Sequence, residues 1–277
     1  MFELPEIMVL AGQMNGTLKG KVISKGSLGN SAHKWVWYNR SHEEFEKLTG
    51  GKSIGEAYPR GRWLCIPLEP GFVLVLGEFG GKALYHASGS KPPKKYHLLI
   101  NFEDGSFFTL MTQMWGAIEL YAQGEELQRN YIKDMRTTPT DAAFTLDYFN
   151  ALIDELVEGQ KRSAKSLLTQ DQIIPGLGNA IAQDILFRAR IHPRRAISEL
   201  TKDERESLYR AITDTVSEIR ERGGRYDEYD LFGNLGGYIR LMDKNASGKP
   251  CPECGTTIEK IQYLGGSCYL CPTCQVL

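Results

Sequence analysis

A chain of 277 residues that is 42% hydrophobic can bury a sizeable core, and it has room for two domains and a small terminal module. Its formal net charge of −1 and isoelectric point near 6.5 exclude a uniformly basic surface, so any nucleic-acid contact must depend on locally placed basic groups. No apolar run is long enough to span a bilayer and no signal peptide is recognisable, so we expect a reduced cytoplasmic compartment and no membrane partner.

The first expected element is a short N-terminal helix over residues 5–18, because apolar side chains recur at helical spacing behind Pro5. From about residue 19 to 120 the pattern changes to short apolar or alternating runs broken by glycine and Asp-Gly turn signals. Strands are predicted for runs such as 63–68, 72–76 and 96–102. This part of the sequence therefore predicts a mostly antiparallel β-sandwich with hairpins.

From about residue 130 onward the pattern becomes helical. Apolar stripes predict helices over residues 146–158, 161–170, 179–190 and 202–222. Thr201 and Glu204 have the spacing of a capping box at the start of the last helix. The sequence as a whole predicts an α+β fold in three parts: a β-sandwich domain over 1–130, a helical domain over 131–245 and a cysteine-rich hairpin over 246–277.

The turn Ile173-Ile-Pro-Gly-Leu-Gly-Asn179 joins two of these helices. Its glycines allow a tight backbone and close approach by another molecule, and Asn179 is expected to be the N-cap of the following helix. Backbone amides at a helix start can bind an anion without a positive side chain, so Gly178 and Asn179 are candidate phosphate contacts. The alternative is an ordinary helical hairpin, but nearby basic side chains, Lys165 among them, favour the phosphate interpretation.

Five of the six cysteines lie in the last 27 residues, in two Cys-Pro-x-Cys knuckles plus Cys268. Two such knuckles are typical of a tetrahedral four-cysteine zinc site on a β-hairpin. Because the two knuckles repeat the same turn, the predicted ligands of one structural zinc ion are Cys251, Cys254, Cys271 and Cys274. Cys268 is three residues before Cys271 and offers a competing spacing, and disulfides in a secreted tail are the other alternative.

The segment from Gly176-Leu-Gly-Asn179 to Pro193 resembles the helix–two-turns–helix of the formamidopyrimidine-DNA glycosylase and endonuclease VIII (Fpg/Nei) family of base-excision repair enzymes. The terminal zinc hairpin and the N-terminal Glu3-Leu-Pro-Glu6 are also similar to that family, and the three landmarks occur in the right order. The resemblance implies a two-domain clamp that closes around damaged duplex DNA. We expect a monomer, cytoplasmic and associated with the nucleoid when bound to DNA.

The resemblance also implies where catalysis should occur. Family enzymes attack the sugar C1′ with the amine of an N-terminal proline and cleave the strand through a Schiff base. Here that position is Phe2, which is too bulky for ordinary removal of Met1, so the first amine is expected to be that of Met1. Glu3 matches the catalytic acid/base and Glu6 the glutamate that follows it, although a glutamate near a helix start is also stabilising by itself.

Other family positions differ as well. The lysine that contacts phosphate corresponds to Arg62, and the zinc-hairpin arginine falls on Gly266. The methionine that fills the void left by a flipped nucleotide aligns near Glu78. The wedge that probes the opposite base aligns with Met114 and Trp115, which could enter a base stack or be ordinary core residues.

Three functions are compatible with these features. The favoured one is a DNA glycosylase acting on damaged bases, with strand-cleaving lyase activity lost or weak. The second is a non-catalytic binder of damaged, abasic or structured DNA on the same scaffold. The third is a protein-interaction role for the zinc hairpin.

Overall fold

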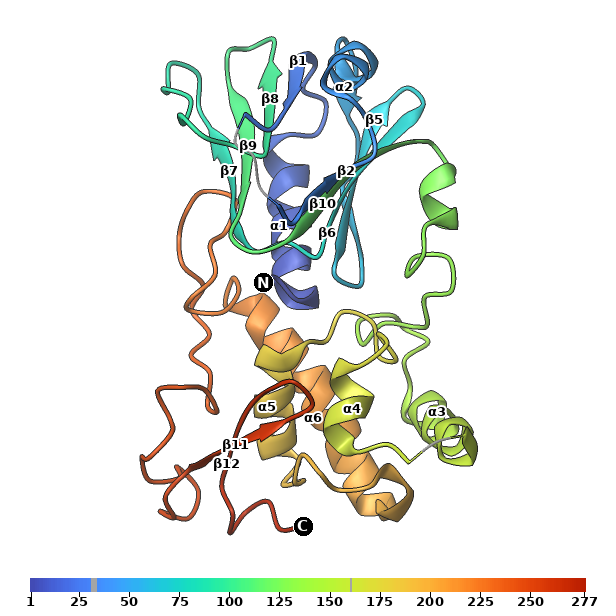
Figure 1. The fold of residues 1–277 in the computed structure, drawn as a ribbon, viewed down its shortest axis with the longest axis vertical. Helices are drawn as coiled ribbons and strands as arrows, with labels where there is room; N and C mark the ends of the chain where they lie inside the picture. Colours follow the sequence, from blue (N-terminus) through green and yellow to red (C-terminus); the bar gives the residue numbers. More distant parts are fainter. Residues whose placement is uncertain (31–33, 160) are drawn as a thin grey trace. The chain divides into compact units, whose positions relative to one another are not determined.

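The computed structural model describes residues 1–30, 34–159 and 161–277, and these form two compact units (Figure 1). The first unit contains Met1–Asp134 and Ile219–Tyr238, and the second contains Met135–Glu218 and Ile239–Leu277. The mixed α+β class predicted from the sequence is confirmed. The three-part division at residues 130 and 245 remains a prediction, and residues 219–238 pack with the first unit.

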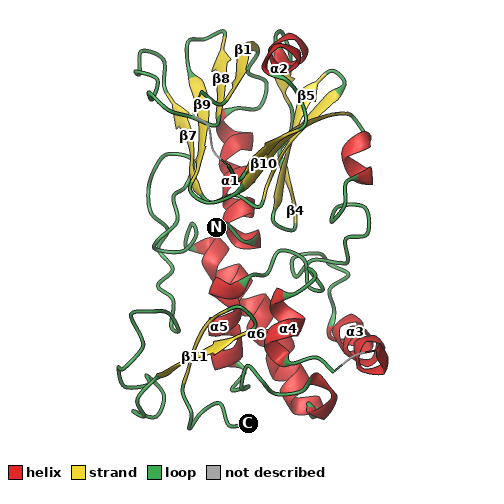
Figure 2. Cartoon of the chain, in the orientation of Figure 1, coloured by secondary structure: helices red, strands yellow, loops and turns green. Residues whose placement is uncertain are grey.

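Two sheets and helix α1 (Leu4–Thr17) build most of the first unit (Figure 2). The four-stranded sheet has the order β1-β8-β9-β7, with bounds Ile23–Leu28, Leu98–Phe102, Phe107–Thr112 and Gly81–His86. The other sheet has the order β2-β10-β6-β5-β3, with bounds Val36–Tyr38, Gly116–Ala122, Phe72–Gly77, Trp63–Glu69 and Ser53–Ile54, and β4 (Tyr58–Arg60) pairs with β5. Among the described strands every pairing is antiparallel except that of β2 with β10.

The core of this unit lies between the two sheets and against helix α1 (Leu4–Thr17). Successive side chains of a strand point to opposite faces, so Leu64, Leu76 and Ile118 enter the core while their chain neighbours face outward. Helix α1 follows the predicted apolar spacing and contributes Ile7 and Met14 to the same cluster. The short elements α2 (His42–Thr49) and η1 (Glu125–Gln128) complete the unit.

Helices dominate the second unit, as the sequence predicts. They are α3 (Leu146–Gly159), α4 (Ala164–Thr169), α5 (Asn179–Arg188), η2 (Ile197–Glu199) and α6 (Lys202–Glu221), whose last residues from Ile219 pack with the first unit. The expected capping box at the start of α6 is present, since the Thr201 N–H donates to Glu204 and the Glu204 N–H donates to Thr201 Oγ1 at 3.2 Å.

The chain ends in a hairpin of β11 (Glu259–Tyr263) and β12 (Gly266–Leu270). A small cluster that includes Phe187, Met242 and Ile258 packs beneath it. Within the described residues no helix is long and apolar enough to cross a membrane.

Candidate functional site

The start of α1 is a buried carboxylate cluster. Glu3 is the N-cap residue, and its backbone N–H donates to Glu6 Oε2 at 3.0 Å in a reciprocal capping box. Each glutamate is only 3% exposed. Two carboxylates buried this deeply require positive partners or hydrogen-bond donors, because an unpaired buried charge is strongly destabilising.

Arg225 is that partner, and it comes from the loop that follows α6. Its guanidinium donates to Glu6 Oε1 and Oε2 at 2.9 Å each, and Nη1 lies 3.6 Å from Glu3 Oε1. Burial by itself would lower the pKa of Arg225, but the charges of Glu6 and Glu3 outweigh it and raise that pKa above its usual value. The arginine therefore stays charged and supplies the positive partner that the two buried carboxylates require.

The N-terminal amine is held by the same loop. Met1 N lies 2.8 Å from Glu228 Oε1, and the Met1 carbonyl accepts a hydrogen bond from Arg225 at 2.8 Å. Gly80 permits this approach, because a Cβ there would lie 2.5 Å from Met1 Cα. The amine is thus an ion-paired primary ammonium beside the carboxylate cluster.

Phe2 is a core residue. It is 1% exposed, its ring packs edge-on against Phe79 at 5.1 Å, and its N–H donates to the Phe79 carbonyl at 2.9 Å. A proline here would lack that N–H donor. Phe2 therefore anchors the start of the chain in the core.

Arg62 and Glu78 form an ion pair at 2.8 Å in the first unit. Arg62 Nη1 lies 4.0 Å from the Met1 sulfur, and its buried Nε has no hydrogen-bond partner in the described part of the chain. Glu78 has a φ of +50°, a left-handed conformation that is uncommon for residues other than glycine. The role of Arg62 as a phosphate contact stays a prediction.

The alternative that Met114 and Trp115 are core residues is wrong. Their side chains are 61% and 44% exposed, and Trp115 packs edge-on against Trp35 with ring centroids 5.9 Å apart. Trp37 is 66% exposed on the neighbouring strand β2. An exposed aromatic surface therefore surrounds the predicted wedge, whose contact with DNA stays a prediction.

In the second unit the structure corrects the expected cap of α5. The N-cap is Gly178, without a side-chain cap, and Asn179 is the first helical residue. The Asn179 side chain instead donates to the Ser267 carbonyl at 3.5 Å on the zinc hairpin. Glycine and asparagine are both accepted at N-caps, so the residue types alone do not decide which of the two is used. Of the two turn glycines expected to allow a positive φ, Gly176 has a φ of +91°, whereas Gly178 is extended at −144°.

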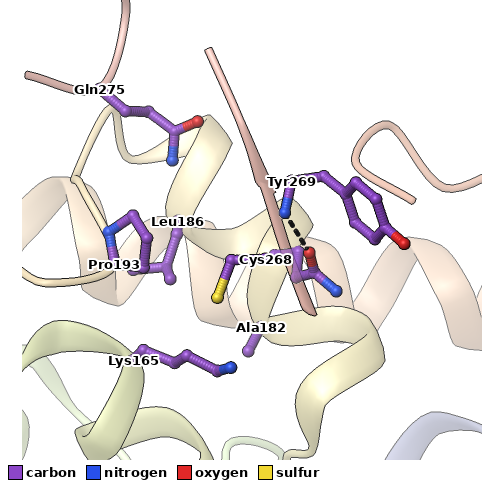
Figure 3. A pocket seen from close by; sticks show the side chains of 8 residues that line it. Lys165, Ala182, Leu186, Pro193, Cys268, Tyr269 and Gln275 are labelled. Carbon is purple, nitrogen blue, oxygen red and sulfur yellow. Dashed lines mark hydrogen bonds between the residues drawn. The ribbon is translucent and has the colours of Figure 1, made fainter. Parts of the chain in front are cut away.

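Lys165 and Gln183 also bind the hairpin. Lys165 is 2% exposed and its Nζ donates to the Tyr263 carbonyl at 2.6 Å, while the Tyr269 N–H donates to Gln183 at 2.7 Å. A Cβ at Gly266 would lie 3.6 Å from Lys165 Nζ, so this ammonium lies beside the hairpin loop. The pocket drawn in Figure 3 encloses about 10 Å³, room for about one water molecule, and is too small for a substrate.

The four predicted zinc ligands converge. The sulfur atoms of Cys251, Cys254, Cys271 and Cys274 all lie within 4.8 Å of one another, and two of the pairs are 3.9 and 3.4 Å apart. A tetrahedral ion with Zn–S bonds of about 2.3 Å places its sulfurs about 3.8 Å apart, so the group fits zinc. Cys268 is buried outside this group and lines the pocket of Figure 3, so the competing spacing is excluded.

Arg225 and Glu228 are the functional-site residues that sequence reasoning missed. Both lie in a loop more than 200 residues from the N-terminus that they contact. The preceding Gly223 and Gly224 have positive φ values and signal a turn, but no local pattern indicates that the turn returns to α1.

Three family models match the chain in order. Residues 1–113 match the formamidopyrimidine-DNA glycosylase N-terminal domain, residues 136–227 match the H2TH domain of formamidopyrimidine-DNA glycosylase, and residues 248–276 match the zinc finger found in FPG and IleRS. Together they cover most of the sequence. The zinc-finger match agrees with the four-cysteine geometry, and the site is a structural zinc site.

Similar proteins extend over the whole length. The formamidopyrimidine-DNA glycosylase of Bacillus anthracis is 29% identical over 279 residues, 99% of each chain, and that of Desulfitobacterium hafniense is 28% identical over 282 residues, 100% of each. The crystal structure of MutM (Fpg) from Thermus thermophilus has a TM-score of 0.81 at 26% identity, covering 99% of this chain and 98% of that one. Lactococcus lactis Fpg bound to DNA with an abasic site has a TM-score of 0.86 at 23% identity, covering 99% and 100%.

Proposed function

Because the chain belongs to the Fpg/Nei family, we propose that it is a zinc-containing DNA glycosylase of base-excision repair that releases damaged bases from duplex DNA with little or no strand cleavage. The observation that carries the second half of this proposal is the exchange of residues at the N-terminus. Phe2 is buried where family members carry the nucleophilic proline, while Glu3 and Glu6 are retained and paired with Arg225.

Water is the proposed nucleophile. Glu3, which lies 3.6 Å from the Arg225 guanidinium, would accept a proton from a water molecule whose oxygen attacks C1′ of the sugar. The C1′–N bond then breaks, its electron pair leaves with the base, and the base takes up the proton that Glu3 accepted, directly or through solvent. The product is a free base and an intact abasic site.

The Met1 amine is a poor substitute for the proline amine. As an ammonium paired with Glu228 at 2.8 Å it has no lone pair available for attack. It also belongs to the residue before the one that supplies the amine in the family, and a displacement of about an ångström lowers a rate on the order of a hundredfold. Without an imine at C1′, the β-elimination that cleaves the strand has no covalent intermediate to start from.

DNA would be bound mainly by residues whose contacts do not depend on the base sequence. Arg62 supplies charge beside the carboxylate cluster, and the turn at Gly178 and Asn179 supplies the positive end of a helix. Lys165, predicted as a phosphate contact, is buried and bound to the Tyr263 carbonyl, so its ammonium would support the hairpin at Gly266, where the family carries an arginine, from within the unit. We expect a monomer that works in the cytoplasm on nucleoid DNA.

The test combines two assays on duplexes with an oxidised base and on abasic duplexes. We expect base release, seen as strand breaks only after hot alkali, and no adduct after borohydride trapping. Glu3→Gln should lower the release rate on the order of 10²- to 10⁴-fold. Glu44→Gln is the matched control, because it alters the carboxylate of the exposed capping box of α2 with Ser41.

Each other outcome has a definite meaning. A trapped adduct would make the amine the nucleophile and overturn the water mechanism. Binding of damaged DNA with neither adduct nor base release would leave the non-catalytic binder. An equal loss of rate in Glu3→Gln and Glu44→Gln would show that Glu3 acts only through stability.

A further inference from the structure

All four tryptophans of the chain gather on one face of the first unit. Trp37, Trp63 and Trp115 line one cavity of about 250 Å³, and Trp35 packs edge-on against Trp115. The remaining lining residues are Glu78, Gly116, Ala117, Arg129 and Tyr131. From these walls we infer that the cavity, called here the tryptophan cavity, binds one unpaired nucleobase.

Strand register creates the hollow. Trp37 on β2 is opposite Ala117 on β10, Ala117 is opposite Gly77 on β6, and Gly77 is opposite Trp63 on β5. Residues opposite one another in a sheet project from the same face. This row therefore has two large side chains at its ends and two small residues between them. The face is the outer one, because the next row, which includes Leu64, Leu76 and Ile118, enters the core.

The deepest wall is rigid. A Cβ at Gly77 would lie 1.6 Å from the Trp63 ring, so the indole lies directly over that glycine. The guanidinium of Arg129 covers the Trp63 ring at 3.7 Å from its centroid, and it is fixed in turn by a salt bridge to Glu119. Trp63 is therefore covered by Gly77 and Arg129 and serves as a fixed floor, and the aromatic surfaces available for stacking are those of Trp37, Trp115 and Tyr131.

The mouth of the cavity is exposed and aromatic. Trp37, Trp115 and Tyr131 are 66%, 44% and 63% exposed, an unusual amount of aromatic surface for one region of a domain. Aromatic side chains that stack on bases are the common device for binding unpaired nucleotides. Flat walls with an open mouth suit a base that enters edge first and remains attached to its strand.

Glu78 gives the cavity a chemical preference. One of its carboxylate oxygens pairs with Arg62, and the strained backbone at φ +50° fixes the residue at the cavity wall. A carboxylate accepts hydrogen bonds from exocyclic amino groups such as cytosine N4. The cavity is therefore expected to prefer cytosine, adenine or guanine to thymine, and Arg62 places a positive charge next to it for the phosphate.

The inference rests on the proposed function only in needing DNA as the ligand. The probes are a fully paired duplex and the same duplex carrying one bulged cytosine or one bulged thymine. Because every tryptophan lines or adjoins the cavity, intrinsic fluorescence reports directly on its occupancy. We expect quenching by the bulged cytosine duplex beyond that caused by the paired one.

Trp37→Ala and Trp115→Ala should reduce the preference for bulged over paired duplex about 5- to 100-fold, the range expected for loss of one base stack. Leu127→Ala is the control, since it removes exposed apolar surface from the same unit without lining the cavity. Glu78→Gln should narrow the preference for cytosine over thymine, because an amide N–H can donate to thymine O4.

Failure of this inference differs from failure of the proposed function. An unchanged bulge preference in both tryptophan variants, with base release intact, would overturn the cavity and leave the glycosylase. If the tryptophan variants instead change the sedimentation of the protein alone, the face joins two copies of the chain and the nucleobase assignment is wrong. Neither result would change the loss of base release expected in Glu3→Gln, which tests the proposed function separately.

Discussion

The N-terminal ends of α1 and α5, which carry the candidate chemistry, are stabilised by different kinds of contact. At α1, Glu3, Glu6 and Arg225 form an ionic cluster in which no residue is more than 3% exposed. At α5 the cap is Gly178, and the side chains around it bind carbonyl groups of the zinc hairpin. The start of α1 is held by ion pairs within one unit, whereas the start of α5 is supported by a hairpin whose fold depends on a metal.

This difference separates the candidate catalytic residues, at the start of α1, from the candidate DNA-binding residues, at the start of α5. The departures from the family that matter for covalent catalysis are concentrated at the first start, where Phe2 is buried and the amine is paired. The second start has the glycine turn and the four converging cysteines, and Gly266 begins β12 of the hairpin. Removal of a charge should therefore destabilise the start of α1, and removal of the metal should destabilise the start of α5.

Removing the metal should have the largest effect. Cys271→Ser should lower zinc content from one ion per chain to none, because a structural site needs all four thiolates. The hairpin would then no longer hold its contacts with Lys165 and Asn179, and DNA affinity should fall more than about tenfold. Elemental analysis and DNA titration measure the two effects.

Cys268→Ser is the matched control for this variant. It changes a buried hairpin cysteine outside the sulfur group and should keep the zinc. Zinc loss in Cys268→Ser with retention in Cys271→Ser would reverse the ligand assignment.

Charge removal at the first start should come next. Arg225→Met leaves two buried carboxylates without their cation, which should lower the free energy of unfolding by about 3–5 kcal/mol. Arg136→Met removes an arginine from an exposed pair with Glu155 and should change it by less than about 1 kcal/mol. Urea unfolding curves that give equal changes would mean that the α1 cluster is not a sealed ionic site.

A smaller effect is expected on DNA affinity, whose dependence on salt should differ between variants in the two units. Arg62→Gln should weaken DNA binding and reduce the slope of log affinity against log salt by about 1, because one phosphate contact loses its charge. Asn179→Ala should weaken binding uniformly across sequences and leave that slope unchanged. Arg210→Gln, on the exposed face of α6, is the control. Unchanged affinity in both test variants would contradict the clamp.

Thiol reactivity should give the smallest effect. Burial raises the pKa of Cys65 to about 12, so in the folded protein it stays a thiol at pH 8 and should not react with a disulfide reagent. Chelation should make the four zinc cysteines reactive and leave Cys65 protected. A fast-reacting Cys65 before unfolding would show that the β-sandwich opens more readily than the hairpin.

Local patterns were sufficient for much of the fold and for the metal. The helices follow from their apolar spacing, the strands from alternation and turn signals, and the zinc ligands from two knuckles that each occupy four residues. In each case the residues that decide the structure are close together in the sequence.

The rest depended on contacts between distant residues. Arg225 meets Glu6 across 219 positions, and nothing near either residue indicates the other. Asn179, expected as the cap, is the first helical residue, and its side chain contacts Ser267, 88 positions away. The tryptophan row requires the register of four strands at once, and a slip of one residue would move each side chain to the opposite face.

The close fit of Met1 against Gly80 has a practical consequence for purification. A tag fused ahead of Met1 would turn its ammonium into a neutral amide and remove the pairing with Glu228. It would also add chain beside the carboxylate cluster, so low activity of such a protein would say little about the native enzyme. Val276 and Leu277 are 70% and 67% exposed, and an affinity tag belongs at that end.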